Sequence, residues 1–145
     1  MQKCVVVTNN PFLYRFVSSG RFIEGSALHV LLDVRDSLHR GGKLLTHPLC
    51  GNLRPYQQPY RSVLTEENPA RDKSGFPIDL ESISIIENAV LVYRSCEERL
   101  ALPALLPETL REDYAFVDFE LMRESLERYG QLLKPQKLSS VFGAA

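Results

Sequence analysis

Short apolar runs separated by turn residues predict four strands in the first 65 residues of the chain. The clearest run, Cys4-Val5-Val6-Val7-Thr8, is rich in β-branched side chains, which is typical of a strand buried on both faces. It ends at Asn9-Asn10-Pro11, a sequence typical of a turn. Three further short strands are predicted, over residues 21–24, 43–46 and 60–65.

Apolar residues at helical spacing predict four helices along the chain. They cover residues 11–18, 26–40, 79–99 and 113–133. Ser26 and Asp79 are the expected N-caps of the second and third helices, and Gly41-Gly42 ends the second. The last helix has an apolar stripe that we expect to be buried, formed by Phe116, Phe119, Met122, Leu126 and Tyr129.

Strands that alternate with helices are typical of βαβ units, which build parallel sheets. We therefore predict an α/β fold with a compact, mainly parallel sheet of about four strands, flanked by helices. A length of 145 residues suits one such domain. We assign residues 1–100 to an α/β core domain and residues 101–145 to a C-terminal helical extension packed on that core.

The charge of the chain is almost balanced, with 17 basic and 18 acidic residues. This balance argues against a polybasic protein that binds nucleic acid. The two parts of the chain differ, however. Residues 1–65 carry eight basic and three acidic side chains, whereas residues 66–145 carry nine basic and fifteen acidic ones. We therefore expect a cationic site in the first part of the chain and no nucleic-acid partner.

The chain has the features of a cytoplasmic protein without a membrane partner. No apolar run reaches the roughly 18–20 residues that span a bilayer, and the N-terminus lacks the pattern of a signal peptide. Cys4, Cys50 and Cys96 have no CxxC spacing, which favours reduced thiols over a disulfide framework or a zinc site. His29 and Asp33 have the i,i+4 spacing of some metal ligands, but two residues alone predict no metal site.

Two loops, residues 8–10 and 46–62, carry most of the polar side chains that could perform chemistry. In an open parallel sheet, ligands bind beyond the carboxyl ends of the strands, and we expect both loops at that edge. The candidate ligand-binding residues are Thr8, Asn9, Asn10, Thr46, His47, Asn52, Arg54, Arg61 and Ser62. Hydroxyls and amides donate and accept hydrogen bonds, and guanidinium groups pair with carboxylate or phosphate. The set therefore predicts a site for a small anionic or amino-acid-like ligand.

Each candidate also has a structural interpretation. Asn9 and Asn10 are of a type common in turns, and arginines in loops are often solvated surface charges. A catalytic interpretation rests on His47, because imidazole titrates near neutral pH and can serve as acid or base while Arg54 or Arg61 orients an anion. Cys50 is a weaker candidate nucleophile, since free cysteines are more often inert.

Several strings of the chain together carry a resemblance to a known family. They are Val7-Thr8-Asn9-Asn10-Pro11, Val34-Arg35-Asp36, Gly42-Lys43-Leu44-Leu45-Thr46-His47-Pro48-Leu49, Gly51-Asn52, Arg54-Pro55 and Pro59-Tyr60-Arg61-Ser62-Val63. Over residues 3–95 the chain resembles the GrdX family, small proteins encoded beside the subunits of glycine, sarcosine and betaine reductases. Cys50 stands where that family is expected to have a small hydroxyl residue, which argues against a required nucleophile there.

The resemblance implies an accessory role near an amino-acid reductase and supplies no catalytic residues. Our first hypothesis is a non-catalytic protein that binds a small anionic or amino-acid-like ligand, or a reductase subunit, through loops 8–10 and 46–62. The second is a small enzyme that uses His47 as its acid or base. The third is a protein-interaction module that docks, or forms a homodimer, through the acidic helices after residue 78. No cofactor is expected under any of the three.

Overall fold

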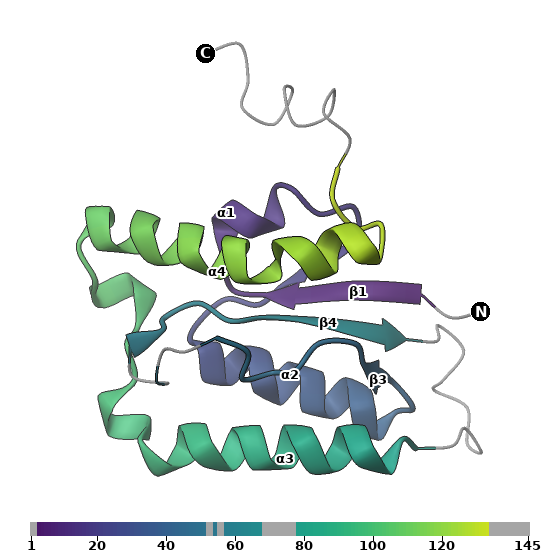
Figure 1. Ribbon diagram of the computed structural model, residues 1–145. Coiled ribbons are helices and arrows are strands. Elements are labelled where there is room, and N and C mark those ends of the chain that lie inside the picture. Colours follow the sequence, from purple (N-terminus) through teal and green to yellow (C-terminus); the bar gives the residue numbers. More distant parts are fainter. Residues whose placement is uncertain (1–2, 52–53, 55–56, 68–77, 134–145) are drawn as a thin grey trace.

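The computed structural model describes residues 3–51, 54, 57–67 and 78–133 and contains a four-stranded sheet with helices on both faces (Figure 1). At its centre lie β1 (Lys3–Thr8) and β4 (Ser62–Glu67). The edges are β2 (Gly20–Phe22) and β3 (Lys43–Leu44), so that the strand order is β2-β1-β4-β3. The four predicted strands are thus confirmed, with shifted boundaries.

The sheet is mixed, and the prediction of a mainly parallel sheet is wrong. Among the described strands, β1 and β2 form the one parallel pair, and they are joined through the short helix α1 (Pro11–Tyr14). β4 pairs antiparallel with both β1 and β3. The reason is the direction in which the chain runs when it returns to the sheet after each strand. A parallel pair needs a crossover connection such as the one through α1, whereas a strand that turns back beside its predecessor pairs antiparallel, as β4 does beside β3.

Different helices cover the two faces of the sheet. α2 (Ala27–His39) and α3 (Leu80–Ser95) pack on one face, and α1 and α4 (Glu108–Arg128) pack on the other (Figure 1). Successive side chains of a strand point to opposite faces. Val5 and Val7 therefore belong to the core beneath α2 and α3, and Val6 belongs to the core beneath α1 and α4. The continuous valine run of β1 is buried on both sides, as predicted.

Local sequence sets the ends of α2 and α3. Ser26 and Asp79 occupy the N-cap positions, as predicted, and the Asp79 carboxylate accepts a hydrogen bond of 3.2 Å from the backbone N–H of Ser82. The Ser82 hydrogen bonds hold the pKa of Asp79 below its usual value. After α2, Gly41 adopts a φ of 101°, a conformation that glycine enters without steric penalty.

The segment between α3 and α4 contains two short 3₁₀ helices, Glu97–Arg99 and Pro103–Leu105. α4 then begins at Glu108, directly after Pro107, and not at residue 113 as predicted. It lies across the sheet face opposite α2 and α3 (Figure 1). The division into a core of residues 1–100 and an extension of residues 101–145 stays a prediction. Within the described residues, no helix is long and apolar enough to cross a membrane.

The buried face of α4 differs in part from the predicted stripe. Its buried residues are Ala115, Asp118, Phe119, Met122 and Leu126. Phe116 is 54% exposed and Tyr129 is 37% exposed, so the prediction is wrong for these two aromatic residues. The predicted stripe runs through apolar residues alone. It therefore leaves out Asp118, which finds hydrogen-bond partners in the interior, and the true buried face is rotated around the helix relative to the predicted one.

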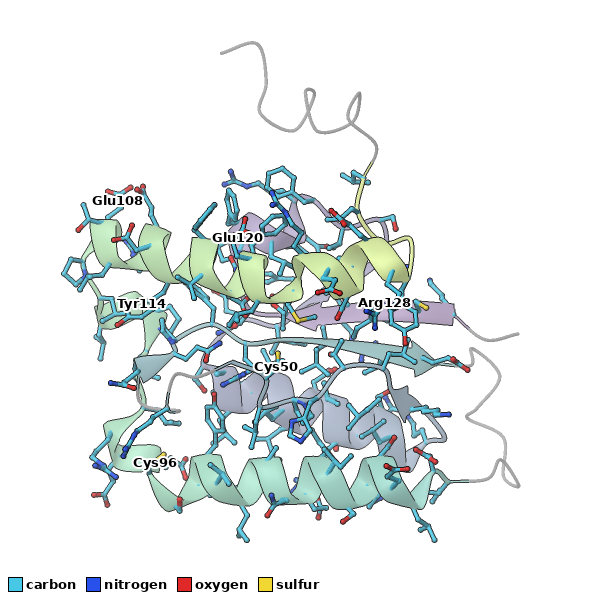
Figure 2. The ribbon with its side chains drawn as sticks, viewed as in Figure 1. Cys50, Cys96, Glu108, Tyr114, Glu120 and Arg128 are labelled. Carbon is cyan, nitrogen blue, oxygen red and sulfur yellow. The ribbon has the colours of Figure 1, made fainter. Side chains whose placement is uncertain are left out.

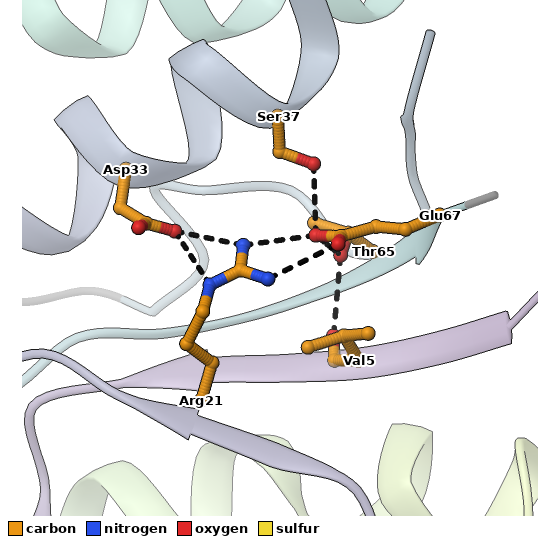
Figure 3. A network of polar contacts seen from close by, with 6 residues as sticks. All are labelled: Val5, Arg21, Asp33, Ser37, Thr65 and Glu67. Carbon is orange, nitrogen blue, oxygen red and sulfur yellow. Dashed lines mark hydrogen bonds and ion pairs between the residues drawn. The ribbon is translucent and has the colours of Figure 1, made fainter. Parts of the chain in front are cut away.

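A charged cluster ties the edge of the sheet to α2 (Figure 3). Arg21 on β2 donates two hydrogen bonds to the Glu67 carboxylate, at 3.0 and 2.9 Å, and one of 2.9 Å to Asp33 on α2. Glu67 also accepts from the hydroxyls of Ser37, at 2.8 Å, and Thr65, at 3.1 Å. We call these five residues the Arg21 cluster. Each charge in it lies against an opposite one, so the cluster is a structural tie between β2, β4 and α2.

Candidate functional site

Five of the predicted site residues meet where β1 ends and β4 begins. Thr8 pairs with Ser62 across the two strands, Asn9 and Asn10 follow β1, and Arg61 precedes β4. All five are almost completely buried, with exposed fractions of at most 3%. The structure thus brings these five predicted residues together, and it places them in the interior of the protein. Their role in ligand binding stays a prediction.

Asp118 on α4 organises the part of this group that faces α4. Its Oδ2 atom accepts a hydrogen bond of 2.7 Å from the Ser62 hydroxyl and one of 3.0 Å from the Asn10 amide. The Ser62 oxygen lies 2.7 Å from the Thr8 hydroxyl, and the same Thr8 oxygen accepts from the backbone N–H of Asn10 at 2.9 Å. We call Thr8, Asn10, Ser62 and Asp118 the Asp118 network. It links both central strands to α4.

The Asp118 carboxyl is 2% exposed, and burial raises its pKa above the usual range. The hydrogen bonds from Asn10 and Ser62 and the positive charge of Arg61 act in the opposite direction. Sequence reasoning missed this residue. The available indication was its spacing, because Asp118 stands three residues after Ala115 and four before Met122, on the face of α4 that is buried.

Asn10 also sets the geometry of α1. Its side-chain oxygen accepts from the backbone N–H groups of Phe12 and Leu13, at 3.0 and 3.2 Å, as an N-cap does. Its amide nitrogen donates to the backbone carbonyl of Ala115 at 2.9 Å. One side chain therefore starts α1 and holds it against α4.

Arg61 lies on the opposite face of the sheet and is 1% exposed. Its guanidinium donates to the Tyr93 hydroxyl at 2.8 and 3.1 Å, to the backbone carbonyl of Cys50 at 2.7 Å and to Gln58 Oε1 at 3.1 Å. Its backbone N–H donates to Asn9 Oδ1 at 2.9 Å. All of these partners are neutral, so no carboxylate is among the groups that hold the guanidinium through these hydrogen bonds.

Three further predicted site residues, Thr46, His47 and Arg54, lie within the described part of the chain. The Thr46 hydroxyl oxygen accepts a hydrogen bond of 2.9 Å from the backbone N–H of Leu64 on β4. His47 is exposed, and its Nδ1 accepts the backbone N–H of Leu49 at 3.0 Å. Arg54 is exposed, and Asn52 lies outside the described residues. Burial raises the pKa of the Cys50 thiol, against the nearby charge of Arg61, which disfavours the thiolate that a nucleophile needs.

Two open grooves flank Tyr60 and Pro11, next to the buried group. The first, which we call the charged groove, has a volume of about 590 Å³. Its lining combines three aromatic rings with two arginines and two glutamates: Phe12, Tyr60, Phe116, Arg15, Arg111, Glu108 and Glu112, beside Pro11 and Ala115. Sequence reasoning did not select these residues, because they come from three separate segments of the chain.

The second groove, the apolar groove, has a volume of about 450 Å³ and shares Tyr60 and Pro11 with the first. Asn9 lines it, together with Phe22, Leu102 and the beginning of α2 around Ser26 and His29. The His29 ring accepts the backbone N–H of Ser26 through Nδ1 at 3.1 Å. Among the predicted site residues that the structure describes, Asn9 is the one that lines either of these two grooves, and it also accepts a hydrogen bond from the backbone N–H of Arg61.

A hydrogen bond and aromatic packing hold the elements that line the charged groove in place. The Asn10 amide joins α1 to α4 beneath it, and Phe12 packs edge-on against Phe16 and Phe119, with ring centroids 5.0 and 5.5 Å apart. Tyr60 is 4% exposed, and burial raises the pKa of its hydroxyl, against the positive charge of nearby Arg111. The hydroxyl therefore stays protonated at neutral pH, next to a guanidinium group.

Comparison with known proteins identifies a family. Searches of curated proteins and of solved structures found no match. The family model described as GrdX-like protein matches residues 5–127, which run from within β1 almost to the end of α4 and include the residues around both grooves. This chain belongs to the GrdX-like protein family.

Proposed function

We propose that this protein is a non-catalytic accessory protein of an amino-acid reductase system and that it binds a small amino-acid-like ligand in the charged groove. Family membership supports the accessory role. The proposed setting is the cytoplasm, which agrees with the three free thiols of Cys4, Cys50 and Cys96.

One observation carries the proposal of a ligand site. The charged groove is open to solvent, and its volume of about 590 Å³ lies in the range of small-molecule sites. It presents aromatic rings and charged groups in the same place. The side chains of the Asp118 network, in contrast, bond to one another inside the protein, and the Arg61 guanidinium bonds to Tyr93, Gln58 and the backbone of Cys50.

Three observations favour binding over catalysis. The Nδ1 atom of His47 already accepts a backbone N–H, and neither His47 nor Cys50 lines the charged groove. Burial also raises the pKa of Cys50, which lowers the thiolate fraction at neutral pH.

The test is calorimetric titration of the full chain with glycine, N-methylglycine, N,N,N-trimethylglycine, acetyl phosphate and inorganic phosphate. We expect at least one amino acid of this group to bind. Arg111→Gln should weaken that binding, whereas Arg128→Gln, at the opposite end of α4 from Glu108 (Figure 2), should not. If none of these compounds binds to the folded chain, the proposal of a small-ligand site fails.

A second candidate function is docking of a reductase subunit. It is favoured by apolar side chains exposed near the apolar groove, namely Leu102 at 41% and Leu105 at 77%. Co-purification with separately expressed reductase subunits tests it. Leu105→Ser should reduce recovery of the partner, with Leu91→Ser on α3 as the matched control, because Leu91 is 66% exposed on another surface. Equal loss with both variants would argue against a defined docking site, and light scattering of the chain alone would detect a homodimer.

A further inference from the structure

We infer that the charged groove selects a small zwitterion, a molecule with a carboxylate and an ammonium group a few bonds apart, over a simple anion. This inference rests on the proposed function and names the class of its ligand. It differs from the cationic anion site that the charges of residues 1–65 predict.

The balance of charge in the groove is the first argument. Arg15 and Arg111 supply two positive charges, and Glu108 and Glu112 supply two negative ones. Among the described residues, none of the four has an ion-pair partner. A site for a simple anion gains from net positive charge, whereas a groove with uncommitted charges of both signs complements a dipolar ligand.

The placement of the two glutamates is the second argument. Glu108 and Glu112 stand four residues apart on α4 and both line this groove. Like charges at this spacing destabilise a helix. An ammonium group bound between them would relieve the repulsion.

The aromatic rings of the groove add to its attraction for the ammonium group of the ligand. Phe116 is 54% exposed and belongs to the same wall of α4 as Glu112. The faces of aromatic rings attract ammonium groups, including alkylated ones. Arg111 and Tyr60 line the same groove, and their guanidinium and hydroxyl groups supply donors for the carboxylate.

The experiment compares four probes with the full chain by calorimetry at constant ionic strength. Glycine and N,N,N-trimethylglycine carry both charges, acetate carries only the carboxylate, and tetramethylammonium carries only the cation. We expect at least one zwitterion to bind about tenfold or more tightly than either single-charge probe.

Variants assign the two charges to their partners. Glu112→Gln should remove most of the preference for the zwitterion over acetate, and Arg111→Gln should remove most of the preference over tetramethylammonium. Glu127→Gln and Arg128→Gln, near the other end of the same helix, serve as matched controls and should change neither ratio. All four positions are on the surface of α4 or partly exposed, so the variants should fold.

The outcomes separate this inference from the proposed function. If acetate binds as tightly as the zwitterions and Arg111→Gln weakens both, the site is an anion site, and the inference fails while ligand binding stands. If zwitterions bind but both groove variants behave as the controls do, the ligand sits elsewhere and the inference fails. If no probe binds, the inference fails together with the small-ligand site.

Discussion

The Arg21 cluster and the Asp118 network lie at opposite ends of β4 and bury charge in two different ways. In the Arg21 cluster, the guanidinium contacts two carboxylates, and the pKa of Arg21 is raised because the hydrogen bonds and charges of Glu67 and Asp33 together outweigh its partial burial. In the Asp118 network, the carboxyl has the neutral donors Asn10 and Ser62. Burial therefore dominates, and the pKa of Asp118 is raised.

The difference shows what decides whether a buried charge is firmly held. Transferring a charge out of water is costly, and a contacting opposite charge with matching hydrogen bonds offsets that cost more fully than neutral dipoles do. We therefore expect the stability of the Asp118 network to depend on pH, because its buried carboxyl has a raised pKa and is hydrogen-bonded to neutral donors. Four measurements test how buried charges are held in this protein.

The largest effect is expected from Arg61→Met. This change leaves the Tyr93 hydroxyl, the Gln58 side-chain oxygen and the Cys50 carbonyl without their donor inside the protein. We expect the free energy of unfolding to fall by about 3–5 kcal/mol, measured by urea denaturation. Arg128→Met, on the surface, is the control and should change it by less than about 0.5 kcal/mol. A small effect of Arg61→Met would mean that the neutral partners contribute little.

The second largest loss of stability is expected from Glu67→Gln, which keeps the shape of the side chain and removes its charge. Arg21 then keeps Asp33 alone as an ionic partner among the residues of its cluster. The expected loss of stability is about 2–3 kcal/mol in the same urea measurement, as for a hydrogen-bonded charge. A loss of stability smaller than the one caused by Asp118→Asn would contradict the predicted order of these two variants.

Asp118→Asn is expected to have a smaller effect at neutral pH, within about 1 kcal/mol of the wild type. The asparagine keeps an oxygen for Asn10 or Ser62 and removes a buried ionisable group. Near-equal urea midpoints for the variant and the wild type would support this. A loss as large as that of Glu67→Gln would show that the carboxylate is held as strongly as in the Arg21 cluster.

The smallest effect is the pH dependence of the Asp118 contribution. A carboxyl whose pKa is higher in the folded than in the unfolded state binds its proton more tightly when folded, so its contribution to stability falls as pH rises from the unfolded value, about 3.9, through the raised folded value. The stability of wild type relative to Asp118→Asn should therefore decrease from pH 4 towards neutral pH. Parallel stability curves for the two proteins would contradict the raised pKa.

Much of the secondary structure could be predicted from short stretches of sequence. The valine run of β1 and the N-caps Ser26 and Asp79 depend on neighbours within a few residues, and all were found where expected. The direction of β4 could not be predicted in this way. It depends on how the chain returns after β3, which apolar periodicity does not encode.

The site shows the same division. The fold brings the predicted residues Thr8, Asn9, Asn10, Arg61 and Ser62 together, while their role in ligand binding stays a prediction. The family resemblance is confirmed by the match over residues 5–127. Their burial depends on partners that are distant in sequence: Asp118 on α4 bonds to Asn10 and Ser62, and Tyr93 on α3 bonds to Arg61. The sequence alone determined the strands, the helix caps and the family. Only the tertiary structure decided which polar groups were buried and which lined a groove, because burial depends on packing between segments that are distant along the chain.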